Sequence, residues 1–384
     1  MFTDHEINLI EYNMSNLSEK YCLDLSEKFY QDTPNNKFNN LSKKLEKHTK
    51  LFFLNLSNNY FNTIPDTIGK LTNLISLNIS RNNFCSLPIV IGNLVNLIKL
   101  DVSENELTSL PNIFENLKNL RYLKLHKNEF VNIPSTIYTF TQLQLLDFSY
   151  NHINKISLDL CKMKNLQKLN LSYCNIEVIP NEIENLVNLK NLDLANNNIN
   201  ELPITIKNLP KLKKLYLENN NIIEINLLDG CLKIKVLFLM SNNIRTFANI
   251  IHVQELFLAD TKMKIIPDFF GNFISLKVLD ISENYINYIP DFFVNLINLE
   301  DLNISYNDII IIPIFIITLE RLIKFSYCRC PIENIHPAVQ RFLDRLVDSG
   351  KNINNIYNDK QNVHTSSIQI SVKESIIKIL SFYL

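Results

Sequence analysis

Hydrophobic residues recur along most of the chain in one fixed pattern. Residues 97–119, LIKLDVSENELTSLPNIFENLKN, contain it in full. Apolar residues occupy the first, fourth, sixth and eleventh positions, an asparagine occupies the ninth, and a Leu-Pro pair with further apolar residues follows. Leu120 restarts the pattern and Leu74 starts it one unit earlier, a spacing of about 23 residues. This period predicts a solenoid of stacked structural repeats.

Each unit is expected to form a short strand and a return segment. The apolar residues of the first six positions alternate with period two, which predicts a strand with its leucines pointing inward. The later section has helical spacing, and its proline suits a first helical position. Because every strand is followed by a return segment, successive strands must run parallel. We therefore predict an α/β solenoid, curved like a horseshoe, with a concave parallel sheet and short helical or irregular convex segments.

The repeats predict the division of the chain. Residues 51–336 hold about thirteen repeats, and residues 1–50 fit the pattern poorly. We expect residues 1–50 to form an N-terminal cap with a strand near Leu23, a loop at 32–36 and a short helix after Asp4. The repeats begin at Leu51, Leu74, Leu97, Leu120, Leu143, Leu166, Leu189, Leu212, Ile234, Val253, Leu276, Leu299 and Leu322.

Two segments follow the repeats. Residues 337–350 have apolar residues on one helical face, Pro337 in the first turn and Gly350 after the last, which predicts a capping helix. Residues 351–367 are polar and Asn-rich, as in a linker. We expect residues 351–384 to comprise this linker and a terminal amphipathic helix, whose apolar residues fall four apart at Ile368, Val372, Ile376, Leu380 and Leu384.

An asparagine recurs where the chain leaves each predicted strand. A buried turn exposes backbone donors and acceptors, and an inward amide can bond both kinds, in its own repeat and in the next. Cys174, Thr261 and Cys330 replace the asparagine in three repeats. The structural column comprises Asn59, Asn82, Asn105, Asn128, Asn151, Asn197, Asn220, Asn242, Asn284 and Asn307.

These residues resemble the leucine-rich repeat family. The segments Ile64-Pro65-x-x-Ile68-Gly69-x-Leu71 and the equivalent one from Leu87 are similar to the intracellular Ras-suppressor, or Ras-group, subclass. The resemblance covers residues 51–336. It implies a curved solenoid that binds proteins on its concave sheet, and it does not name the partner.

The repeat spacing is interrupted once. Residues 225–232 lack the proline, and the repeat from Ile234 has only about 19 residues, with 246–252 as a shortened convex side. One interpretation is a tolerated deletion on the convex surface. The other is a local change of curvature near a binding site.

Apolar residues gather beside this irregularity at strand positions that point away from the core. Exposed aromatic residues on neighbouring strands are typical anchors of protein interfaces. We therefore expect a protein-binding site on the concave face at Tyr216, Val236, Phe238, Met240 and Phe257. The alternative is that the C-terminal tail or an irregular loop covers them.

Charged residues form two further groups on the predicted concave face. A basic patch, with Tyr150 and Tyr173 beside it, comprises Arg121, Tyr122, Lys124, His126 and Lys127. An acidic group toward the far end comprises Glu255, Asp260, Asp280, Glu283, Glu300 and Asp301. This asymmetry would orient a protein partner. The alternative is a generic solvated face.

Composition limits the chemistry. The formal net charge of −1 argues against a nucleic-acid partner. No stretch predicts a membrane span or a secretory signal, and the seven scattered cysteines favour reduced thiols. Cys328 and Cys330 with His336 are interpreted as structural, and no phosphate loop or catalytic signature is found. We expect no enzyme activity, cofactor, metal or small-molecule substrate, and an intracellular, cytoplasmic location. The Asn, Ile and Lys bias suggests a protist or a large virus infecting one, and then the cytoplasm of the host.

Two functions fit this pattern. The first is a non-catalytic scaffold or adaptor in signal transduction that binds a protein partner on the concave face. The alternative is a regulatory or substrate-targeting subunit of an enzyme complex, such as a ubiquitin ligase or a phosphatase, recruited through residues 351–384.

Overall fold

The computed structural model describes residues 21–28 and 34–348. The chain divides into two compact units, residues 1–189 and 190–384. In the described residues each unit has seven parallel strands of three residues, and their order in the sheet follows their order in the chain. The predicted fold class is therefore confirmed as a leucine-rich repeat type of solenoid.

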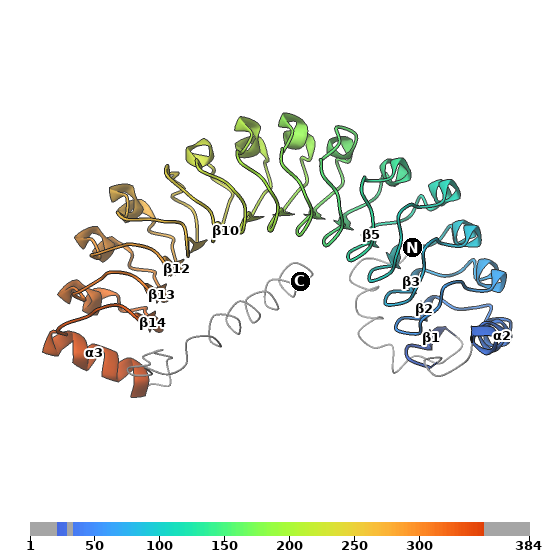
Figure 1. Cartoon of the computed structure of the whole chain (residues 1–384), viewed down its shortest axis with the longest axis horizontal. Helices are drawn as coiled ribbons and strands as arrows, with labels where there is room; N and C mark the ends of the chain where they lie inside the picture. Colours follow the sequence, from blue (N-terminus) through green and yellow to red (C-terminus); the bar gives the residue numbers. More distant parts are fainter. Residues whose placement is uncertain (1–20, 29–33, 349–384) are drawn as a thin grey trace. The chain divides into compact units, whose positions relative to one another are not determined.

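The first unit stacks one strand per repeat in register. Leu77, for example, lies opposite Leu100, its equivalent one repeat later. The strands line one side of the unit and the return segments line the other (Figure 1). The strands are β1 (Cys22–Asp24), β2 (Phe53–Asn55), β3 (Ser76–Asn78), β4 (Lys99–Asp101), β5 (Tyr122–Lys124), β6 (Leu145–Asp147) and β7 (Lys168–Asn170). The return segments are α2 (Pro34–Leu45), η2 (Asp66–Lys70), η3 (Ile89–Asn93), η4 (Asn112–Asn116), η5 (Ser135–Thr139), η6 (Leu160–Lys162) and η7 (Asn181–Asn185).

The second unit repeats this arrangement, and its described part ends in an α-helix with buried apolar side chains. Its strands are β8 (Asn191–Asp193), β9 (Lys214–Tyr216), β10 (Val236–Phe238), β11 (Glu255–Phe257), β12 (Val278–Asp280), β13 (Asp301–Asn303) and β14 (Lys324–Ser326). Its helices are η8 (Ile204–Asn208), η9 (Asn226–Leu228), η10 (Asp268–Asn272), η11 (Asp291–Asn295), η12 (Ile314–Thr318) and α3 (Pro337–Asp348). Val339 and Leu343 of α3 are buried, and the helix packs on η12.

The core of each unit lies between the strands and the return segments. The middle residue of each strand points into it, as with Leu100 and Leu123, each 1% exposed. Phe114 of η4 closes the same core from the other side. The first and third residues of each strand point the opposite way, since side chains alternate along a strand. We call the surface that these residues form the open face.

Apart from α2, the described return helices are 3-10 helices, where the spacing also allowed α-helices. Each has five residues or fewer and most follow an extended proline, so there is little room for an α-helical turn. The chain instead forms the hydrogen bonds of a 3-10 helix, which join residues three apart. The Leu117 N–H, for example, donates to the Phe114 carbonyl at 2.9 Å. Near the N-terminal end of the first unit the structure also differs from the prediction. Helix α2 begins at Pro34, inside the segment 32–36 that was expected to be a loop.

Part of the predicted N-terminal cap and of the C-terminal region lies outside the described residues. This holds for the helix expected after Asp4, for Gly350, and for the linker and terminal helix of residues 351–384. Their predicted structure stays a prediction.

The asparagine column bonds its own repeat and the preceding one, not the following one as expected. Asn151 Nδ2 donates to the carbonyls of Phe148 at 2.9 Å and of Leu125, one repeat back, at 3.0 Å. Its Oδ1 accepts the N–H of Phe130, also in the preceding repeat, at 3.0 Å. All ten column residues are buried. Within each unit these amides therefore fasten a repeat to its predecessor.

The three replacements reproduce part of this function. Cys174 Sγ donates to the Phe148 carbonyl at 3.5 Å, and Cys330 Sγ donates to the Ile304 carbonyl at 3.2 Å. Thr261 Oγ1 donates to the Leu258 carbonyl at 2.9 Å. A single donor suffices for one carbonyl, but none of these side chains has the two-donor amide of asparagine.

A second asparagine column, which the sequence pattern had not suggested, lies before the strands. Asn96 Nδ2 donates to the carbonyl of Thr72, one repeat earlier, at 2.9 Å, and Asn119 does the same to Val95 at 2.9 Å. Further members of this column are Asn165, Asn188 and Asn298. The signal in the sequence is the recurrent Asn-Leu pair that opens these repeats.

Candidate functional site

The third residue of each strand forms a column along the open face. In most repeats it is Asp or Asn, and its Oδ1 accepts the backbone N–H of the residue two positions later at 2.9 to 3.1 Å. This short turn is a common use of Asp and Asn. The residues that do so are Asp24, Asn55, Asn78, Asp101, Asp147, Asn170, Asp193, Asp280 and Asn303.

Three consecutive repeats replace this turn residue with an aromatic ring. Tyr216 on β9 lies opposite Phe238 on β10, and Phe238 lies opposite Phe257 on β11. The ring centroids of the first pair are 5.0 Å apart at 27°, and those of the second are 4.1 Å apart at 11°. Stacking follows from the register, because parallel strands place equivalent side chains about 4.8 Å apart. We call these three residues the aromatic ladder.

The exposure of the expected anchors differs from the prediction. Phe238, Met240 and Phe257 are half-buried, whereas Tyr216 is 1% exposed and Val236 is 8% exposed. Tyr216 and Val236 are therefore not exposed anchors. For Tyr216 part of the reason is stacking, since the neighbouring ring of Phe238 covers one of its faces.

Ionisable groups border the aromatic ladder within the second unit. Burial raises the pKa of Glu255 above its ordinary value, and nearby Lys214 and Lys277 act in the opposite direction. Burial also raises the pKa of Asp280, which lies opposite Phe257 on β12. At Glu283 burial and the charges of two neighbouring carboxylates raise the pKa. Part of the predicted acidic group is therefore buried, and the group does not form a uniformly charged surface.

The remaining acidic residues are paired with lysines. Glu300 accepts from Lys277 Nζ at 3.1 Å, and Asp301 accepts from Lys324 Nζ at 3.1 Å. Asp260 pairs with Lys262. The expected sign asymmetry is therefore reduced by local compensation.

The predicted basic patch is compensated in the same way. Lys127 Nζ lies 3.4 Å from Glu104, and Lys124 Nζ lies 3.7 Å from Asp101. His126 Nδ1 lies 3.5 Å from Asp147 Oδ2. Glu104 and Asp101 stand in the preceding repeat, so the register that aligns the two lysines also supplies their counter-ions.

The aromatic members and neighbours of this patch are ordered by the same register. Arg121 and Tyr122 are half-buried, and Lys99 Nζ lies 5.3 Å from the Tyr122 ring centroid. Tyr150 and Tyr173 stack at 4.0 Å between centroids and remain 42% and 41% exposed. The patch therefore combines basic, acidic and aromatic side chains.

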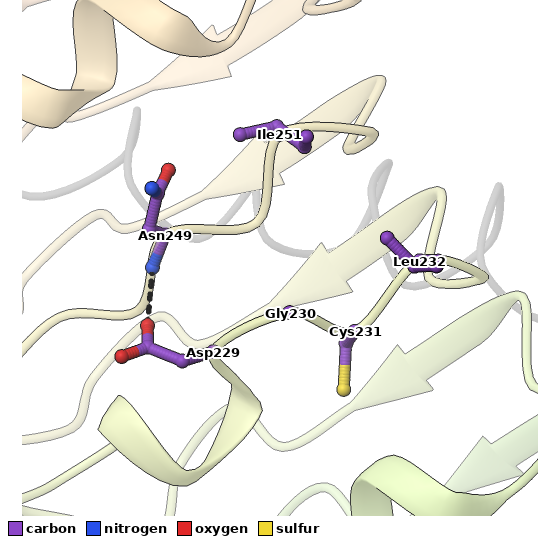
Figure 2. Close-up of a pocket in the computed structure, with 6 residues that line it drawn as sticks. All are labelled: Asp229, Gly230, Cys231, Leu232, Asn249 and Ile251. Carbon is purple, nitrogen blue, oxygen red and sulfur yellow. Dashed lines mark hydrogen bonds between the residues drawn. The ribbon is translucent and has the colours of Figure 1, made fainter.

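The repeat irregularity produces a pocket away from the open face. In the part of the chain that the structure describes, no helix separates β10 from β11, and Asp229 Oδ1 accepts the Asn249 N–H at 2.6 Å (Figure 2). The hydrogen bond ties the shortened repeat to the one before it. The pocket has a volume of about 290 Å³ and is lined by Asp229, Gly230, Cys231, Leu232, Asn249 and Ile251. Burial raises the pKa of Cys231 to about 11, so its thiol is protonated at neutral pH and is a poor nucleophile.

Residues 21–28 and 34–348 contain no group of three or more His, Cys, Asp or Glu placed to hold a metal ion. Among the helices described, none is long and apolar enough to cross a membrane.

Comparison with known proteins agrees with the fold. Two family descriptions match, "Leucine-rich repeat region" at residues 4–133 and 135–237 and "Leucine rich repeat" at residues 251–309. No curated protein matches the sequence.

Solved structures with the same architecture come from bacteria and plants. A leucine-rich repeat protein of Leptospira interrogans is 27% identical, with a TM-score of 0.71 over 90% of this chain and 98% of that one. An internalin of Listeria monocytogenes is 23% identical, with a TM-score of 0.69 over 83% of this chain and 89% of that one. A plant peptide hormone receptor in complex with the peptide RGF2 is 27% identical, with a TM-score of 0.61 over 76% of this chain and 49% of that one. The first family description covers more than half of the chain, which therefore belongs to the leucine-rich repeat family.

Proposed function

We propose that this protein is a non-catalytic scaffold that binds a partner protein on the open face of its second unit. The anchors are Phe238, Met240 and Phe257, which keep accessible surface. The observation that carries the proposal is the aromatic ladder itself. In three consecutive repeats it replaces the Asp or Asn that serves the turn elsewhere.

A structural role alone does not explain this replacement. Phe257 gives up the turn that Asp193 makes with Ala195 in β8, although Ala259 stands at the equivalent place after Phe257. Aromatic side chains are enriched at the centres of protein interfaces, where they supply large apolar contact area. A binding role accounts for aromatic residues at turn positions that the other repeats fill with polar ones.

The comparisons support the same class of function. The leucine-rich repeat fold is commonly used for protein–protein interaction, and the plant receptor of similar architecture is solved with a bound peptide. The Leu-Pro repeats with Ile68-Gly69 support membership of the intracellular Ras-group subclass and an adaptor role in cytoplasmic signal transduction.

The test is a comparative affinity purification with mass spectrometry. Full-length wild type, Phe238→Ala/Phe257→Ala and the control Ile274→Ala/Ile297→Ala are used as baits in cells of the source. The control removes two exposed apolar residues that lie outside the strands. Partners retained by wild type and control but lost by the ladder variant would support the site. Equal recovery with all three baits would refute it.

A further inference from the structure

The aromatic ladder has a shape that suits one kind of ligand. The rings of Phe238 and Phe257 are stacked face to face and keep accessible surface, so they present their edges to the open face as a narrow apolar ridge on β10 and β11, beside the buried ring of Tyr216 on β9. Its rungs are 5.0 and 4.1 Å apart. Side chains four residues apart on an α-helix are separated by about 5–6 Å. A helix with an apolar residue at every fourth position can therefore place successive side chains over the two accessible rings, Phe238 and Phe257.

This chain contains such a sequence beyond its described residues. Ile368, Val372, Ile376, Leu380 and Leu384 are each four residues apart, with polar or charged residues at several of the positions between them. The apolar stripe is long enough to follow the two accessible rings and to extend beyond them. The ladder and this segment belong to the same unit, residues 190–384.

The chain between them is long enough to allow the contact. The description ends in α3 at Asp348, and residues 349–367 provide 19 residues before the amphipathic stretch. Extended chain spans up to about 3.4 Å per residue, or roughly 60 Å for this length. Three strand spacings separate β14 from β11, about 14 Å at the usual distance between strands. The connection is therefore ample.

The charges next to the ladder match those of the segment. Acidic side chains stand beside the ladder, at half-buried Glu255 on β11 and at exposed Glu283 after β12. Residues 368–384 contain two lysines, Lys373 and Lys378, and one glutamate, a formal balance of +1. Such complementarity orients a ligand on a surface and disfavours the reverse arrangement.

We propose that residues 368–384 bind along the aromatic ladder of their own chain as an amphipathic helix. An external partner then displaces this segment and presents the same chemistry, an apolar stripe with a four-residue period flanked by basic residues. The inference rests on the proposed function only in taking the ladder as the binding surface. It adds the class of ligand and a means of regulation.

The first test locates the segment by photo-crosslinking in the full-length protein. A benzophenone amino acid replaces Ile376, and a control places it at Glu374, two positions away on the helix. Light-induced crosslinks are mapped by mass spectrometry. We expect an intramolecular crosslink from position 376 to residues 236–257, with Met240 a favoured acceptor, and at least a fivefold lower yield from position 374. Crosslinks to α3, or only between two molecules, would overturn the proposal.

The second test measures competition at the same site. A fluorescein-labelled peptide of residues 365–384 is titrated against full-length protein in which Ile376→Asp/Leu380→Asp disables the internal segment. We expect saturable binding that is at least tenfold weaker with wild-type protein, because a tethered competitor has an effective concentration near the millimolar range. Binding should disappear when Phe238→Ala/Phe257→Ala is added to the disabled background. Equal binding to all three proteins, or to none, would overturn the proposal.

The two proposals fail separately. If external partners are lost with the ladder variant but the peptide does not bind, the ladder is a partner site without an internal ligand. If the peptide binds and no external partner depends on the ladder, the internal segment is the ligand and the scaffold function at this surface is wrong.

Discussion

Phe238 and Phe257 stack at 4.1 Å between ring centroids although the two residues belong to the shortened repeat and its successor. Their backbones are directly paired, Phe238 opposite Phe257, so the loss of convex residues leaves the sheet register intact. The open face is thus preserved where the return segments change. Its side chains can vary without disturbing the solenoid.

Replacing Phe257 by asparagine should remove the binding surface at little cost in stability. Asparagine occupies the same place in β2, β3, β7 and β13, and Phe257→Asn would let Oδ1 accept the Ala259 N–H as Asp193 accepts that of Ala195. The lost ring contact is worth about 0.5–1.5 kcal/mol, the lost apolar burial of a half-buried ring roughly 1 kcal/mol more, and the new hydrogen bond returns about 0.5–1.5 kcal/mol. Urea unfolding should therefore give a stability within about 2 kcal/mol of wild type. A loss above about 3 kcal/mol would show that the ring is a core residue.

Asn151→Ala should destabilise the protein by about 1–3 kcal/mol, the usual cost of leaving buried backbone groups unpaired. Asn151 Nδ2 and Oδ1 bond four backbone groups in two repeats. Asn151→Cys should cost less than the alanine, because Cys174 fills the equivalent place in the next repeat with its thiol on the Phe148 carbonyl. Parallel urea titrations of the two variants measure the order. Equal midpoints for alanine and wild type would contradict the role of the column.

Asp280→Asn should stabilise the protein at pH 7.5 and weaken its pH dependence. Burial raises the folded-state pKa of Asp280 above the ordinary value of 3.8. A carboxyl group with a raised folded-state pKa binds protons more tightly in the folded state. Its contribution to the stability of the fold therefore becomes less favourable as pH rises through that pKa. The contribution of Asp280 to stability becomes more favourable as pH falls from the raised folded-state pKa toward 3.8.

Asparagine retains the acceptor without the charge. In β7, Asn170 Oδ1 accepts both the N–H and the hydroxyl of Ser172, as Asp280 does from Ser282. Thermal unfolding at pH 7.5 and pH 5 should give a gain for Asp280→Asn that is larger at pH 7.5. A gain that is larger at pH 5 would show the opposite sign of the pKa shift.

Tyr306 should be replaceable by asparagine with a gain in stability and by valine only with a loss. Its backbone has φ of 56°, in the left-handed region, and its side chain is 44% exposed. Asn58 and Asn219 occupy the same turn position elsewhere, with φ of 61° and 53°. Asparagine tolerates this conformation better than other residues, whereas a β-branched residue is poorly suited to it.

The expected effects of these two substitutions have opposite signs. We expect up to about 1 kcal/mol of stabilisation for Tyr306→Asn and more than about 1 kcal/mol of destabilisation for Tyr306→Val. Differential scanning calorimetry distinguishes them. Two variants with the same melting temperature would indicate that the turn relaxes.

Much of the fold follows from residues that have the same environment in every repeat. Leu100 points inward because its neighbours alternate, and Asn105 is buried because the turn needs its amide; both conditions recur about every 23 residues. The close approach behind the Ile-Gly motif was harder to anticipate. A side chain at Gly92 would lie 2.8 Å from Ile113 of the next repeat, so glycine is required by packing between repeats.

The candidate site was only partly predictable. The aromatic positions were found from the strand alternation, but the burial of Tyr216 was not. The counter-ions of the basic patch could have been found, since Asp101 and Lys124 are 23 residues apart and one repeat places them side by side. The hydrogen bonds of the second asparagine column could have been found from the same spacing of one repeat.

The sequence by itself determined the solenoid, its repeat boundaries and its buried leucines, because each depends on a local pattern within one repeat. Only the tertiary structure decided which open-face residues stay accessible, which charges are compensated, and that each Asn151-type amide reaches back to the preceding repeat. Those properties depend on side chains in adjacent repeats. Their distances and burial are set by the stacking of strands, which the pattern within a single repeat does not specify.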